Sequence, residues 1–287
     1  METKKLPNGN KKAKTVGITN QQSAEDAQDD ADSVISDLVD REYLDSDMED
    51  YGVSPTVLKE VSNGSRTKRP RDHVLPSTDF VPGTLDMSKF KMLKQPSYAT
   101  PEATKQLGKK LQELVKVQNS SKLHELGWFI DSEKIENLYQ WIIELHSFDK
   151  DLPLASDMKK SGISSIVLEM RFNANFPFSP PFVRVVSPRF LPFMAGGGGH
   201  ITAGGAICME LLTNNGWLVT QPLASVLLQI RMAISSTEPK PARLENGGGR
   251  NGAFGSYAVS EAIEAYKRAC RTHGWEVPKD IETMQHE

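Results

Sequence analysis

Cys208 is the residue of this sequence whose surroundings point most directly to chemistry. Residues 196–208, GGGGHITAGGAIC, hold six glycines and His200 but no charged side chain. Glycines allow backbone amides to approach a reacting group closely, and long irregular segments inside compact domains tend to be functional. The pattern therefore favours a nucleophilic cysteine over a small apolar residue that happens to follow a glycine-rich stretch.

The residues around Cys208 also narrow the type of reaction. Residues 190–230 contain neither Lys nor Arg, although these make up 34 of the 287 residues. A thioester on Cys208 would be attacked by any nearby amine, so surroundings without lysine protect it. No cation close in sequence stabilises a thiolate either. This favours a thiol that accepts an already activated acyl group.

A cysteine hydrolase is the competing chemistry. It needs a histidine base within hydrogen-bond reach of the thiol and a third group that orients the histidine. Of the six histidines, His200 alone is close in sequence, and no Asn or Asp is evidently placed to orient it. Hydrolysis is therefore disfavoured. The other cysteine, Cys270, falls in a predicted helix, where we expect it to be packed and inert.

Hydrophobic periodicity predicts the elements that position Cys208. Thr100 and Pro101 are typical of a helix start, and Gly274 of a helix end. Ser260 is the expected cap of the last helix, and Pro222 falls in the first turn of a buried one. Strand segments separate from helices predict an α+β fold, with a four-stranded antiparallel sheet flanked by helices. We expect helices at 100–118, 222–236 and 260–273, and strands at 127–131, 138–148, 163–172 and 182–188.

Composition divides the chain into two parts. Residues 25–50 hold twelve acidic residues and one basic residue, and RTKRPR at 66–71 holds four basic ones. Such charge blocks bury little apolar area, so residues 1–95 are predicted to be a disordered arm and residues 96–287 the folded domain. The basic cluster could direct the chain to the nucleus.

The same composition excludes several classes of protein. No secretory signal and no apolar run of membrane-spanning length is present, and two cysteines suit a reducing compartment. We expect a cytoplasmic or nuclear protein without a membrane partner. The net charge of −3 gives no reason to expect a nucleic-acid partner, and no metal site is predicted.

Three features in order carry a family resemblance: FNANFPFSPPFVRV at 172–185, GGAIC ending at Cys208, and Trp217 nine residues later. Together they resemble the ubiquitin-conjugating enzymes, and GGGGHITAGGAICMELLTNNGW resembles their Q-type branch. The resemblance covers about residues 98–287. It implies that Cys208 accepts ubiquitin from the activating enzyme as a thioester and transfers it to a substrate lysine, with ubiquitin, activating enzyme, ligase and substrate as partners. No bound cofactor is implied, because ATP is used by the activating enzyme.

The resemblance also implies roles for other residues. Phe172 matches an exposed loop aromatic that contacts ubiquitin ligases in many members of the family. Lys105, Lys109 and Lys110 lie where the activating enzyme docks. A tight turn implies a cis peptide bond between Phe176 and Pro177.

The sequence departs from the family at three places. The usual His-Pro-Asn is Gly198-Gly199-His200, so His200 is the candidate for the role of that Asn, as an oxyanion donor or a loop brace. The Ser-Pro-Ala segment used in ligase binding is replaced by residues 218–220, Leu-Val-Thr. The acidic residue that helps to deprotonate the incoming lysine falls near 242–243, Ala-Arg, so that role is either vacant or taken by Glu245, with Glu210 as the other nearby acid. A non-catalytic scaffold of the same fold that binds ubiquitin or a ligase is the alternative.

Overall fold

The computed structural model describes residues 79–245, 255–279, 281 and 284. The acidic block at 25–50 and the basic cluster at 66–71, together with the predictions that rest on them, lie outside the described residues.

The predicted order of helices and strands is confirmed. As expected, the helix that follows Thr100 starts with Pro101, and the Thr100 side chain accepts a hydrogen bond from the Ala103 N–H. The helices are α2 (Pro101–Ser120), α3 (Leu123–Leu126), α4 (Pro153–Lys160), α5 (Leu223–Ser235) and α6 (Val259–His273), and the strands are β1 (Trp128–Ile130), β2 (Gln140–Leu145), β3 (Ile166–Arg171) and β4 (Phe182–Ser187). Short 3-10 turns lie at Met87–Lys89, Ser132–Lys134, Phe193–Ala195 and Glu210–Leu212.

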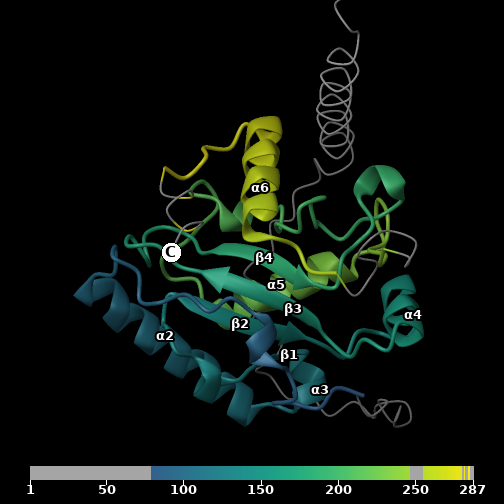
Figure 1. The fold of residues 1–287 in the computed structure, drawn as a ribbon, viewed down its shortest axis with the longest axis horizontal. Helices are drawn as coiled ribbons and strands as arrows, with labels where there is room; N and C mark the ends of the chain where they lie inside the picture. Colours follow the sequence, from purple (N-terminus) through teal and green to yellow (C-terminus); the bar gives the residue numbers. More distant parts are fainter. Residues whose placement is uncertain (1–78, 246–254, 280, 282–283, 285–287) are drawn as a thin grey trace, which may run out of the picture. The chain divides into compact units, whose positions relative to one another are not determined.

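The four strands form one antiparallel sheet in the order β1-β2-β3-β4 (Figure 1). Alternate residues of β2 face opposite sides: Trp141 and Ile143 join the main core, whereas Ile142 joins a separate cluster on the other face. The main core lies between the sheet and the helices α2 and α5, which supply Leu107, Leu114 and the buried face of α5. The predicted α+β class is confirmed.

The opposite face of the sheet is also covered, partly by residues that we expected to be disordered. Leu85, Met87, Phe90 and Met92 pack against the apolar cluster of that face, and Leu93 is buried. The predicted boundary at residue 95 is therefore wrong for residues 79–95. Their apolar side chains come after the charge blocks and bury enough surface to stay on the sheet.

Two short helices and two helix starts differ from the prediction. α3 and α4 were not expected, because helices of four and eight residues leave too short a periodic pattern to detect. α6 starts at Val259, with Ala258 rather than Ser260 as the cap, since the Glu261 carboxylate accepts a hydrogen bond from the Ala258 N–H. Pro222 caps α5 from just outside its first turn.

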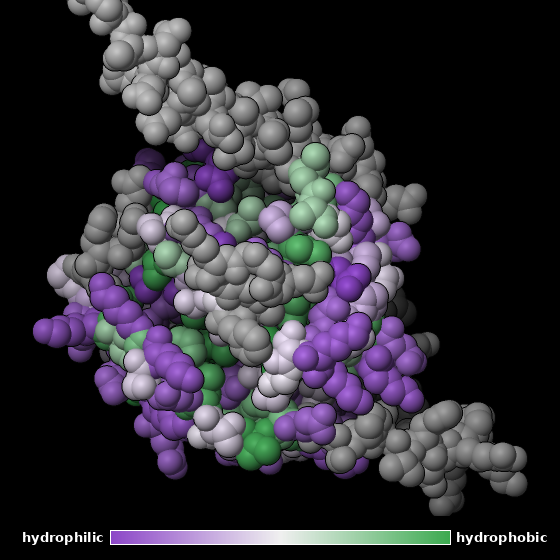
Figure 2. Space-filling view, turned by 45° about the vertical axis from the view of Figure 1, so that its right-hand side comes forward, coloured by the Kyte–Doolittle hydropathy of each residue, from purple (hydrophilic) through white to green (hydrophobic). Residues whose placement is uncertain are grey.

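Hydrophilic and apolar residues alternate in small areas over the face shown in Figure 2. Among the described residues, no helix combines the length and the apolar character needed to cross a bilayer.

Residues 79–95 are here called the N-terminal segment. His146, which directly follows β2, packs against Phe80 of this segment. The two rings stack with centroids 4.1 Å apart and planes 4° from parallel. Burial lowers the pKa of His146 from 6.5 to about 4, so the ring is neutral at pH 7. Its Nε2 has no hydrogen-bond partner among the described residues.

We predict that stability falls as the pH drops through this window. Between pH 6.5 and about 4 the unfolded chain binds a proton that folded His146 does not, so the free energy of unfolding decreases. The loss should be about 1–3 kcal/mol. His146→Phe keeps the stack and removes the titration, so urea denaturation at pH 7 and pH 4.5 should show a smaller loss. His124→Gln, at a partly exposed histidine, should keep the wild-type loss. An equal loss in His146→Phe would contradict the assignment.

Candidate active site

Cys208 ends a tight hairpin formed by residues 200–208. Its N–H donates to the His200 carbonyl at 2.9 Å. The second limb of the hairpin pairs with β4, where the Ile207 N–H donates to the Val183 carbonyl at 3.1 Å. The backbone of the sheet therefore fixes the position of Cys208, and the side chain is partly exposed.

The glycines of this hairpin serve close packing. A Cβ on Gly204 would lie 2.3 Å from the Glu261 carbonyl oxygen and 2.7 Å from the Ala265 Cβ, both on α6. Only a residue without a side chain allows the hairpin to approach α6 this closely. We predicted that the glycines bring backbone to a reacting group; Gly204 instead brings the hairpin to α6.

The C-terminal end of α6 contributes a residue that sequence reasoning missed. His273 is the last residue of α6, and its Nε2 lies 3.4 Å from the Cys208 Sγ. Its ring stacks on Trp275 with centroids 4.3 Å apart and planes 13° from parallel. A histidine in the last helical turn before Gly274 is visible in the sequence, but nothing local pairs it with a cysteine 65 positions away.

A thiol beside an imidazole can transfer its proton to give a thiolate–imidazolium pair. His273 lies in the last turn of α6, where the helix dipole favours cations in general. Tyr266 of α6 stays neutral because burial raises the pKa of its hydroxyl. The nearby thiols of Cys270 and Cys208 raise that pKa further. Cys270 is fully buried, as predicted, and burial raises the pKa of its thiol.

His200 lies beside Cys208, but its contact with the Cys208 backbone favours bracing the loop. Its Nδ1 lies 3.3 Å from the Cys208 carbonyl oxygen, which can only accept, so Nδ1 carries the proton. In the neutral ring Nε2 is then an acceptor. Donation from Nε2 to an oxyanion therefore requires the imidazolium form of His200. His200 also adopts a left-handed backbone conformation, with φ of 57°.

Phe172 is not the exposed aromatic that we expected. It is 0% exposed and packs against Trp141, with ring centroids 4.6 Å apart, and Phe176, at 4.9 Å. It directly follows β3, and the alternation of the strand turns its ring toward the core. The prediction of a ligase contact at Phe172 is therefore wrong.

Two exposed apolar side chains, Phe178 and Leu218, lie on two loops that a hydrogen bond joins. The bond between Phe176 and Pro177 is cis, as predicted. The Trp217 indole N–H donates to the Pro177 carbonyl at 2.7 Å and joins the proline loop to the segment after Trp217. Phe178 is 76% exposed and Leu218 60%, one on each of the two joined loops.

The remaining predicted residues have no contact with Cys208 among those described above. Lys105 and Lys109 are exposed on α2, and Lys110 pairs with Glu113 at 3.1 Å. Glu245 pairs with Arg189 at 3.4 Å, and Glu210 is exposed two residues after Cys208. In the described part of the chain, no three or more His, Cys, Asp or Glu side chains gather in a way that could hold a metal ion.

Residues 164–247 match the family model described as ubiquitin-conjugating enzyme. The mouse (Mus musculus) ubiquitin-conjugating enzyme E2Q-like protein 1 is 37% identical over 154 residues, which cover 52% of this chain and 89% of that protein. The chain belongs to the ubiquitin-conjugating enzyme family, in its Q-type branch. It is thus an enzyme of ubiquitin conjugation, a process whose general partners are ubiquitin, an activating enzyme and a ligase.

Longer relatives match over a part of their length. The human (Homo sapiens) ubiquitin-conjugating enzyme E2 Q1 is 37% identical over 150 residues, which cover 50% of this chain and 32% of that protein. Among solved structures, the ubiquitin-conjugating enzyme UbcA1 from Agrocybe aegerita is 16% identical, covers 48% of this chain and 86% of its own, and has a TM-score of 0.36.

The contact between Cys208 and His273 predicts the reactivity of the thiol. In a Cys270→Ser background, His273→Ala should slow alkylation of Cys208 by iodoacetamide about 3-fold to 10-fold at pH 7, because the thiol loses its proton acceptor. At pH 9 solvent hydroxide deprotonates the thiol, so the difference should narrow. His124→Ala is the matched control and should change neither rate. Equal rates for His273→Ala and the parent protein at pH 7 would contradict the pairing.

Proposed function

We propose that Cys208 accepts ubiquitin from the activating enzyme as a thioester and passes it to a substrate lysine. The observation that carries this proposal is the contact of the Cys208 Sγ with His273 on a hairpin attached to the sheet. Family membership supplies the reaction class. ATP is used by the activating enzyme, and this chain binds no cofactor of its own.

The loading step exchanges one thioester for another. The Cys208 thiol gives its proton to His273, and the thiolate attacks the carbonyl carbon of the ubiquitin thioester on the activating enzyme. The new C–S bond forms as the bond to the activating enzyme's sulfur breaks, and that sulfur leaves as a thiolate. Bond types are conserved, so the step needs no further source of energy.

The discharge step forms an amide. A neutral lysine amine attacks the thioester carbonyl on Cys208, and the sulfur leaves as a thiolate that His273 can stabilise or protonate. His200 holds the backbone of Cys208, so we assign it the role of loop brace. Two acids are candidates for removing the proton of the amine. Glu210 is exposed and only two residues from Cys208 in the sequence, whereas Glu245 already pairs with Arg189. We therefore favour Glu210.

Two alternatives make different predictions. A scaffold would form no thioester at all. A hydrolase would release ubiquitin to water, and His273 removes one objection to it, because a base does lie within reach of the thiol. The proposed transferase accumulates a thioester that survives without an acceptor.

From its two cysteines and its basic cluster, we also propose that the chain works in the cytoplasm or the nucleus.

The thioester is directly testable. Incubation with activating enzyme, ATP and ubiquitin should give an adduct that a thiol reductant removes, as seen on non-reducing and reducing gels. Cys208→Ser should give an oxyester that resists the reductant, whereas Cys270→Ser should charge normally because Cys270 is fully buried. No adduct would favour the scaffold, and an adduct that water alone removes within minutes would favour the hydrolase.

We further propose that the exposed pair of Phe178 and Leu218 contacts the ligase in place of Phe172. Phe178→Ala should change stability by less than about 0.5 kcal/mol, since the side chain is exposed. It should reduce ligase-stimulated discharge of the thioester without affecting discharge to free lysine. Phe172→Ala should instead lower the free energy of unfolding by about 3–5 kcal/mol through loss of core packing. Thermal melting and discharge assays with a ligase that stimulates the wild type distinguish the two. Undiminished stimulation in Phe178→Ala would refute this contact.

A further inference from the structure

A cluster of buried charges lies on the face of the sheet that is turned away from α5. Glu169 of β3 contacts Arg171 of the same strand, with Nη2 to Oε1 at 2.9 Å, and Arg184 of β4, with Nε to Oε2 at 2.6 Å. Their side chains are at most 7% exposed. Burial opposes ionisation of Glu169, but the two guanidinium charges outweigh it and hold the pKa of the carboxyl below its usual range. We call Glu169, Arg171 and Arg184 the charge cluster.

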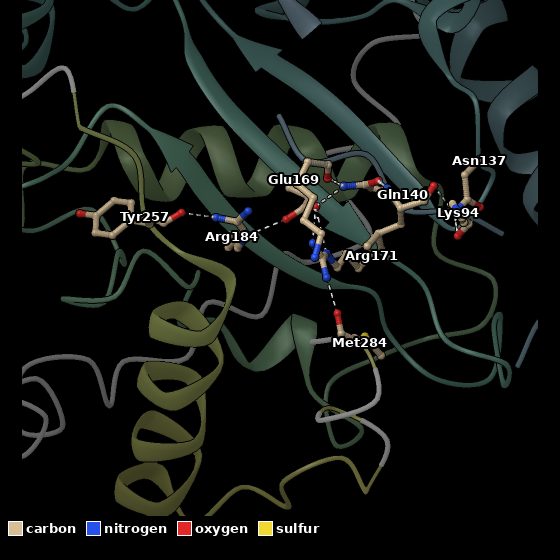
Figure 3. Close-up of polar contacts among 10 residues, drawn as sticks. Lys94, Asn137, Gln140, Glu169, Arg171, Arg184, Tyr257 and Met284 are labelled. Atoms are coloured by element: carbon tan, nitrogen blue, oxygen red, sulfur yellow. Dashed lines mark hydrogen bonds and ion pairs between the residues drawn. The ribbon is translucent and has the colours of Figure 1, made fainter. Parts of the chain in front are cut away.

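The charge cluster reaches other segments of the chain (Figure 3). Arg184 Nη1 donates to the Tyr257 carbonyl at 2.9 Å, two residues before α6 begins. Arg171 Nη1 donates to the carbonyl of Met284, beyond the end of α6. Glu169 thus holds two arginines, each of which binds the chain on one side of α6.

The described residues among 257–284, namely 257–279, 281 and 284, are here called the C-terminal segment and include His273. Their apolar contacts include Phe182 of β4 and Ala206 of the hairpin, together with Ile281 and Met284. Apolar contacts are non-directional and set an approximate position. Charge-assisted hydrogen bonds from a rigid guanidinium have defined geometry, so the two arginines bind the segment in defined positions at Tyr257 and Met284.

β4 connects this arrangement to the thiol. Arg184 forms a backbone bridge with Ala206, two residues before Cys208, while its side chain holds Tyr257. One residue of β4 therefore contacts both the hairpin that carries Cys208 and the segment that carries His273.

We propose that Arg171 and Arg184, held by Glu169, are positioning residues for the reaction at Cys208. They fix both ends of the C-terminal segment and so keep the imidazole of His273 within reach of the thiol. This inference rests on the proposed role of His273. It assigns a catalytic consequence to a cluster that would otherwise be only structural.

Arg171 offers the sharper test. The start of the C-terminal segment has further anchors, since Arg189 binds Glu261 and the Tyr257 hydroxyl accepts from the Phe190 N–H at 2.8 Å. Beyond α6, Arg171 binds the segment from the sheet through its hydrogen bond to the Met284 carbonyl. Arg171→Lys keeps the charge beside Glu169, but a single ammonium cannot reproduce both sets of contacts.

The experiment measures the alkylation of Cys208 by iodoacetamide from pH 6 to pH 9 in a Cys270→Ser background. Arg171→Lys should slow alkylation about 3-fold or more at pH 7, with the difference narrowing at pH 9, as for His273→Ala. The matched control is Gln140→Leu. Gln140 also binds Glu169, but it holds the N-terminal segment through the Lys91 carbonyl and the Leu93 N–H. It should lower the melting temperature and leave the pH profile unchanged.

The double variant His273→Ala/Arg171→Lys tests whether the arginine acts through the histidine. Arg171→Lys should have no further effect on the profile once His273 is absent. If His273→Ala itself leaves the profile unchanged, the proposed role of His273 fails. If His273→Ala slows alkylation but Arg171→Lys does not, or if Gln140→Leu alters the profile equally, the positioning inference alone is overturned.

Folding is checked by circular dichroism, and Arg184→Lys is the second variant if Arg171→Lys does not fold. It keeps a charge beside Glu169 and removes the bond to the Tyr257 carbonyl, so it should change the pH profile in the same direction. If neither variant folds at 25 °C, the cluster determines stability rather than position, and the inference is overturned.

Discussion

The backbone pairing between β4 and the hairpin of residues 200–208 is the constraint on which the rest of the active site depends. Through the bond between Ile207 and Val183, a loop rich in glycine becomes an extension of the sheet. The position of Cys208 then follows from the rigid core beneath β4. A nucleophile held by sheet hydrogen bonds loses less orientational freedom in the reaction than one on an unsupported loop.

Bringing α6 against this hairpin requires a close approach of two backbones. Gly204 allows it, because any side chain there would overlap the Glu261 carbonyl. The contact delivers His273 to Cys208 and supplies the proton acceptor that the sequence around the cysteine lacks. The lack of lysine and arginine in residues 190–230 is thus compatible with a base for the thiol, because the histidine that lies beside Cys208 comes from a distant part of the sequence.

The charge cluster affects both the stability of the fold and the position of the segments around α6. Glu169 leaves water only because two arginines and Gln140 satisfy its oxygens. Removing one member of such a cluster typically destabilises a protein by about 3–5 kcal/mol, whereas the intact cluster adds little net stability compared with apolar residues. What the cluster contributes is positional specificity, because its hydrogen bonds hold the segments before and after α6 in defined places.

The sequence by itself determined the α+β class, the strand order and the cis bond before Pro177, because each depends on local pattern or on residues adjacent in the chain. The same kind of local pattern made Cys208 the candidate nucleophile. The sequence did not determine the burial of Phe172, the packing of residues 79–95 on the sheet or the pairing of His273 with Cys208. Those depend on which face of a strand meets the core and on contacts between residues far apart in the chain. A histidine at the end of one helix and a cysteine 65 positions earlier share no local signal. Only the approach of α6 to the hairpin, which Gly204 permits, brings the two together.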